Sequence, residues 1–105
     1  MKSIHKKVFN EIFYVSIHFV IFKHEKYIKK KYGIIVKGSG TIELDNEIWV
    51  FFRSDQPLDV LVHECDHVIS EIWRLRGIKK LKGIDESYAY NLQWLFDKLY
   101  KKLKS

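Results

Sequence analysis

Apolar runs alternate with lysine-rich stretches along the chain, and this pattern predicts most elements of the fold. Residues 12–22 are apolar except for Ser16 and His18. Their β-branched and aromatic side chains favour a strand that is buried on both faces and therefore central in its sheet. Periodicity alone also allows a buried helix in this run. Residues 1–11 are polar and basic without a clear period, so we expect a loosely held lead-in there.

A short helix and a hairpin are predicted next. Residues 23–32 combine many lysines with a few apolar side chains and end at Gly33, which is typical of a short surface helix. Residues 34–36 favour a short extended piece. Residues 41–44 and 47–52 are both strand-like and flank Asp45 and Asn46, two residues suited to a tight turn. This pattern predicts a β-hairpin.

Two longer helices complete the chain. The first spans about residues 57–76, starting at Pro57 and ending before Gly77. The second starts near Asp85, a suitable N-cap, and its period turns six residues inward: Tyr88, Ala89, Leu92, Leu95, Phe96 and Leu99. The length allows a single domain over residues 1–105. The predicted class is α+β, with a small antiparallel or mixed sheet packed on these two helices.

Charge and cysteine content bear on the binding partners and the cellular compartment of the protein. The net charge is +6 and comes mostly from lysines on predicted helix faces, which favours solvated surface over a nucleic-acid interface. Cys65 is the only cysteine, so an intrachain disulfide is excluded, and its place between two histidines indicates a small packing residue. The apolar run 12–22 is too short to cross a bilayer as a helix. We expect a cytoplasmic protein without a membrane partner.

The segment His63-Glu64-Cys65-Asp66-His67 contains the zinc signature H-E-x-x-H. Residues four apart lie on the same face of a helix, so His63 and His67 can offer two imidazoles to one ion. Glu64 lies beside them, where a carboxylate can take a proton from a metal-activated water without being a ligand. Asp59 or Asp66 could hold the second nitrogen of a histidine ring. A core helix that carries two histidines by chance is the alternative.

A catalytic zinc usually has three protein ligands and one open position. Asp85 and Glu86, at the start of the last helix, are the candidates for the third ligand. We expect Glu86, because the helix period places Glu86, Ala89, Tyr90 and Gln93 along one stripe. A capping carboxylate without metal contact is the alternative.

These residues show a resemblance. His63, Glu64 and His67, followed by a second helix that carries a glutamate, are similar to the gluzincin group of zinc metallopeptidases. Four local strings look like a family of very small phage-encoded metallopeptidase-like proteins: Glu47-Ile48-Trp49-Val50, His63-Glu64-Cys65-Asp66-His67, Arg76-Gly77-Ile78 and Glu86-Ser87-Tyr88-Ala89-Tyr90. The resemblance covers residues 47–100 well, and before them only the order of elements.

The resemblance implies a minimal zincin fold and a location in the host cytoplasm. It implies that an edge strand, residues 47–52, lines the cleft and pairs with an extended peptide or protein substrate. It also implies hydrolysis of peptide bonds, with Zn²⁺ held by His63, His67 and Glu86 and with Glu64 as general base. Larger gluzincins stabilise the oxyanion with a His or Tyr from a domain after the glutamate helix, and in this chain Tyr88, Tyr90 or Arg53 could stand in for it.

Two other functions stay open at this stage. The chain could be a catalytically weak or inactive binding protein on the same scaffold, which captures a host or partner protein. A nucleic-acid-associated protein that uses its lysines ranks last, because it leaves the histidines and Glu64 without a role.

Overall fold

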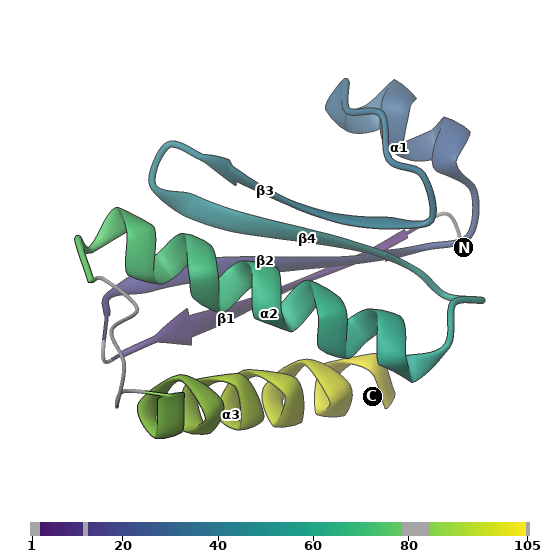
Figure 1. Cartoon of the computed structure of the whole chain (residues 1–105). Helices are drawn as coiled ribbons and strands as arrows, with labels where there is room; N and C mark the ends of the chain where they lie inside the picture. Colours follow the sequence, from purple (N-terminus) through teal and green to yellow (C-terminus); the bar gives the residue numbers. More distant parts are fainter. Residues whose placement is uncertain (1–2, 12, 79–84, 105) are drawn as a thin grey trace.

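The computed structural model describes residues 3–11, 13–78 and 85–104, with only the backbone of residues 85 and 86 (Figure 1). These residues form four strands and three helices. In chain order they are β1 (Ser3–Asn10), β2 (Val15–Phe22), α1 (Glu25–Tyr32), β3 (Ser39–Leu44), β4 (Glu47–Arg53), α2 (Leu58–Leu75) and α3 (Asp85–Lys104).

The four strands form one mixed sheet with the order β1-β2-β4-β3. β2 pairs with β1 antiparallel and with β4 in parallel, and β3 pairs with β4 antiparallel. The α+β class and the central place of β2 are therefore confirmed. The prediction that residues 47–52 form an edge strand is wrong, because β4 lies between β2 and β3. The hairpin partner β3 occupies the end of the sheet instead.

The prediction of a loose lead-in before residue 12 is also wrong, because Ser3–Asn10 forms strand β1. Its side chains alternate between the two faces of the sheet: Val8 and Asn10 are buried, whereas Lys7 and Phe9 are exposed. The inward positions carry both polar and apolar residues, so the hydrophobic pattern does not show the period of a strand. Pairing along the whole of β2 holds the segment in place.

One face of the sheet is covered by α2 and α3, which lie side by side in Figure 1. The main core fills the space between this face and the two helices, with Phe19, Phe52, Leu61, Ile69 and Leu95 among its fully buried side chains. A smaller cluster on the other face packs under α1. This arrangement fixes α2 against β3 and β4.

The turns and helix ends follow the predicted chemistry. Asp45 and Asn46 have φ values of 53° and 64°, which is the backbone of the tight hairpin turn. Gly33 ends α1 with φ 70°, and Gly77 follows α2 with φ 69°. In α3, Tyr88, Leu95 and Leu99 are buried as predicted. Ala89 is exposed, so its predicted inward position is wrong.

A polar cluster lies on the sheet face that α1 partly covers. The buried His18 bonds through Nε2 to Glu47 Oε1 at 3.0 Å and through Nδ1 to His5 Nε2 at 2.9 Å, and its ring stacks on Trp49. Burial, followed by the nearby His18, Lys31 and Lys7, lowers the pKa of His5. The hydrogen bond from His18 lowers the pKa of Glu47. These contacts order the outer face of β1, β2 and β4.

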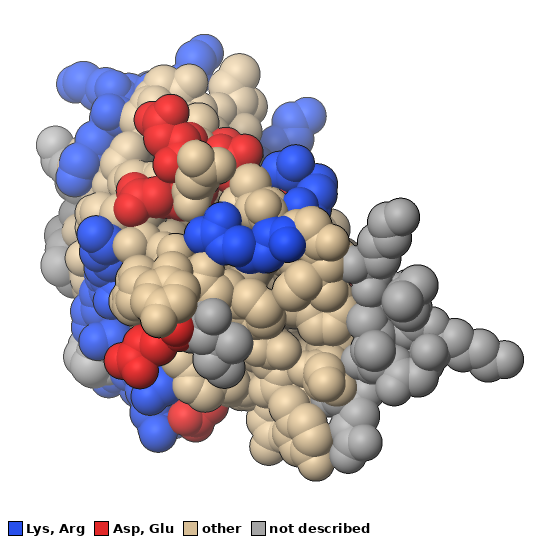
Figure 2. All heavy atoms as spheres, turned by 90° about the vertical axis from the view of Figure 1, so that its left-hand side faces the viewer, with Lys and Arg blue, Asp and Glu red and all other residues tan. Residues whose placement is uncertain are grey.

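Charged side chains of both signs lie on the surface. Figure 2 shows Lys and Arg side chains along the left and upper margins of one face and also near its middle, with acidic side chains among them. The lysines of α1, Lys26, Lys29, Lys30 and Lys31, are exposed, as predicted for a solvated helix surface. Among the described residues, no helix has both the length and the apolar character needed to cross a membrane.

Candidate active site

The apolar stripe of α2 decides where its polar residues point. Leu61, Cys65, Val68, Ile69 and Ile72 are fully buried against the sheet and α3. His63 and His67 therefore lie on the opposite side of the helix, and both are exposed. Glu64 lies at the margin of the buried stripe, next to β3.

The two histidines face each other. His63 Nε2 and His67 Nε2 are 2.9 Å apart, and their rings are nearly perpendicular, at 88°. At this distance one ring donates a hydrogen bond and the other accepts it. Two nitrogens bound to one tetrahedral zinc lie about 3.3 Å apart, so a small movement of either ring would open the space for an ion.

Glu64 is held by the sheet. Glu64 is buried, with 5% of its surface exposed. Thr41 Oγ1 of β3 donates a hydrogen bond of 2.8 Å to Glu64 Oε1. Thr41 Oγ1 also lies 3.4 Å from the backbone oxygen of Glu64. A buried carboxylate needs such a donor. The bond therefore fixes the Glu64 side chain beside the two histidines.

His63, Glu64 and His67 line a cleft between β3 and α2. The cleft has a volume of about 570 Å³, and its walls are residues 39–43 of β3 and His63, Glu64, His67 and Glu71 of α2. Arg74 links the two walls, because its guanidinium lies 2.8 Å from Glu71 Oε2 and 3.5 Å from Glu43 Oε1. One wall of the cleft is thus the strand at the end of the sheet.

Tyr88 lies on the other flank of α2. It is buried, and its hydroxyl donates to Asp66 Oδ1 at 2.6 Å and lies 2.6 Å from Ser70 Oγ. Burial, with a further contribution from the bond to Asp66, raises the pKa of Tyr88 to about 12. Asp66 therefore anchors α3 through Tyr88 and does not support a histidine ring.

Two other candidate electrophiles also lie away from the histidines. Tyr90 is 63% exposed on α3. The guanidinium of Arg53 bonds to Glu25 at 2.7 Å and to Asp55 at 2.6 Å, between α1 and the turn before α2. Neither residue lines the described cleft, and neither does Tyr88. The catalytic roles of Tyr88 and Tyr90 stay predictions.

The side chain of the predicted third ligand, Glu86, lies outside the described part of the structure, as does that of Asp85. The backbone of Glu86 lies in the first turn of α3. Among the residues whose side chains are described, no group of three His, Cys, Asp or Glu could hold a metal ion. Cys65 is fully buried, and burial raises the pKa of its thiol to about 12, which fits the predicted packing role.

Thr41 is the site residue that the sequence analysis missed, although the sequence holds a signal for it. A two-residue turn at Asp45 and Asn46 places Leu44 opposite Glu47. The same register places Thr41 opposite Val50, which faces the helices. A polar residue at that position of an otherwise apolar face needs a polar partner, and Glu64 is that partner.

We expect Thr41→Val to lower the free energy of unfolding by about 1–2 kcal/mol, because the buried Glu64 carboxylate loses a donor. Thr41→Ser keeps the hydroxyl and should stay within about 0.5 kcal/mol of the wild type. Urea unfolding of the three proteins checks this. A loss in the serine variant with no loss in the valine variant would show that the methyl group of Thr41 matters and the hydrogen bond does not.

The structure thus brings His63, Glu64 and His67 together in one cleft and adds Thr41 to them. Comparison of the chain with protein-family models, with curated proteins and with solved structures finds no match. The geometry of the cleft and the motif on α2 are therefore the basis for a proposed function.

Proposed function

We propose that the protein is a zinc-dependent metallopeptidase with a minimal zincin fold. The observation that carries the proposal is the position of three side chains in one cleft: two facing imidazoles, His63 and His67, and the adjacent carboxylate of Glu64. Solvated helix surface does not require this arrangement, and a hydrolytic zinc site does.

The donor set suits zinc. Neutral imidazole nitrogens are common zinc ligands, and the two Nε2 atoms lie 2.9 Å from each other. Glu86 would complete the set with a carboxylate from α3. A bound zinc ion would supply Lewis-acid chemistry, polarising a carbonyl group and acidifying water. The proton transfer and the binding of the substrate are assigned to residues of the protein itself.

The substrate in this proposal is an extended peptide that lies along β3. β3 stands at the end of the sheet and forms one wall of the cleft, so a peptide can add to it as a further strand. Main-chain hydrogen bonds would then hold the peptide beside His63 and Glu64 without a deep specificity pocket. The expected setting is the cytoplasm.

Glu64 is the general base in this proposal. Its carboxylate accepts a proton from the attacking water and passes it to the leaving amine. Thr41 holds one carboxylate oxygen at 2.8 Å, so the carboxylate has a fixed orientation before substrate arrives. A preorganised base does not have to be ordered during the reaction.

A screen of unstructured peptides tests the proposal. We expect the zinc-loaded protein to cleave members of a peptide library, detected as new termini by mass spectrometry. A chelator should stop the cleavage, and added zinc should restore it. Cleavage that persists after complete removal of metal would contradict the proposal.

One observation favours a second function, a binding protein on the same scaffold. Glu64 is 5% exposed and already bonded to Thr41, which leaves little of its carboxylate open to the cleft. In that case the β3 edge would hold a partner protein without turnover. The Glu64→Gln variant would then bind the partner as well as the wild type does.

A further inference from the structure

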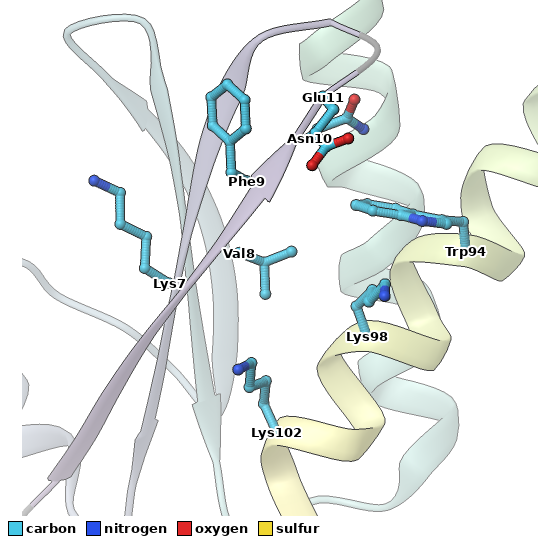
Figure 3. Close-up of a pocket in the computed structure, with 8 residues that line it drawn as sticks. All are labelled: Lys7, Val8, Phe9, Asn10, Glu11, Trp94, Lys98 and Lys102. Atoms are coloured by element: carbon cyan, nitrogen blue, oxygen red, sulfur yellow. The ribbon is translucent and has the colours of Figure 1, made fainter.

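A second groove lies at the opposite end of the sheet, far from the histidines in the strand order. It runs between β1 and α3 and has a volume of about 490 Å³. Figure 3 shows Lys7 and Phe9 pointing to one side of β1, and Val8 pointing to the other, toward α3. Since side chains from both sides line it, the groove follows the outer edge of the strand.

The helix contributes one stripe of side chains to this groove. Trp94, Lys98 and Lys102 are four residues apart and lie above one another along α3 (Figure 3). Lys98 Nζ is 5.8 Å from the centre of the Trp94 ring. Lys6 Nζ donates to the backbone oxygen of Lys102 at 3.1 Å, which ties the strand to the last turn of the helix.

We infer that this groove binds an extended acidic peptide, which adds to the edge of β1 as a fifth strand of the sheet. The peptide would place two acidic side chains at alternate positions against Lys102 and Lys98, and an apolar side chain two residues further on against Trp94.

The spacing of the helix and of a strand supports this pattern. Residues four apart on a helix are separated by about 6 Å along its axis. Alternate residues of a strand are separated by about 6.8 Å. Consecutive inward side chains of an added strand would thus meet Lys102, Lys98 and Trp94 in turn. Among the described residues β1 is the last strand of the sheet, and the outer edge of such a strand is where a further strand adds.

The positive charge of the groove favours an acidic peptide as its ligand. Of the described residues, three lysines line the groove, Lys7, Lys98 and Lys102, against one acidic residue, Glu11. A second copy of β1 would bring Lys6 and Lys7 against the same lysines, and like charges across a strand pair are unfavourable. An acidic strand meets the same lysines with opposite charge. The edge thus disfavours pairing with itself and favours an acidic partner.

The experiment uses capped seven-residue peptides and the full ¹⁵N-labelled chain. The probes alternate threonine with Glu, Glu and Leu, in that order and in reverse order, because the direction of pairing is open. We expect one of them to bind saturably and to shift amide signals of β1. A peptide of the same composition with its two Glu residues adjacent, and a peptide N-methylated at alternate residues, should both bind at least about tenfold more weakly.

Charge reversal supplies the matched comparison. Lys98→Glu with Lys102→Glu should weaken binding about tenfold, whereas Lys26→Glu with Lys30→Glu on α1 changes the net charge equally and should stay within about twofold. A probe with Lys in place of Glu should prefer the Lys98 and Lys102 double variant, which shows that this variant is folded. Absence of saturable binding, amide shifts outside β1 and α3, equal affinity for the control peptides, or equal binding of a single-stranded oligonucleotide would overturn the inference.

Discussion

Glu64→Gln should reduce peptide hydrolysis by at least about 100-fold, because general-base catalysis typically contributes a factor of 100 to 10,000. Glutamine has nearly the same shape and can still accept the hydrogen bond from Thr41, so the helix and the cleft should remain intact. It cannot take a proton from water. The rate is measured as kcat/KM on the best peptide from the library screen, together with the zinc content of both proteins.

Glu71→Gln is the matched control for this variant. Glu71 is a second carboxylate in the same cleft, one turn after His67, and it is bonded to Arg74. Its replacement removes the same charge from the same cleft without removing the proposed base, so kcat/KM should change only a few-fold. If the Glu64 variant kept full activity with zinc bound, Glu64 would not be the base. If both variants lost activity equally, the charge of the cleft would be the cause.

Leu61→Ala should destabilise the protein by about 2–5 kcal/mol, the usual cost of truncating a buried leucine. Leu61 is fully buried between α2 and the sheet, whereas its neighbour Val62 is 41% exposed. Val62→Ala should therefore change the free energy of unfolding by about 0.5 kcal/mol or less. Urea or thermal unfolding followed by circular dichroism measures both.

The contrast between these neighbours tests how α2 is oriented. The same orientation that buries Leu61 turns His63 and His67 outward. A large loss in the Val62 variant with a small loss in the Leu61 variant would mean that α2 is rotated about its axis, and the cleft described above would then be lost.

Local patterns of the sequence were sufficient to predict many of the elements. The hairpin around Asp45 and Asn46, the end of α1 at Gly33, and α2 within one residue at each end follow from turn and capping chemistry that acts over a few residues. The apolar residues at 15–22 were sufficient to predict that this strand lies in the middle of its sheet, because a strand with apolar side chains on both faces needs cover on both sides.

Features that depend on distant partners were not predicted. β1 has a mixed polar and apolar inward face, and it is a strand because β2 pairs with it along its full length. The resemblance implied that residues 47–52 form an edge strand, and nothing in their own sequence reveals that β2 pairs with β4 in parallel on its other side. The motif predicted that His63 and His67 share a face, but the bond from Thr41 to Glu64 depends on how the hairpin meets α2.

The proposed zinc site can be measured by calorimetry. Metal-free wild-type protein is titrated with zinc, beside His63→Ala, His67→Ala and Glu86→Gln, with Glu71→Gln as the control. We expect one zinc ion per chain in the wild type and the control, and lost or clearly weakened binding in the other three variants. A wild-type protein that takes up no zinc, or zinc binding that is unchanged without His63 and His67, would contradict the proposed site.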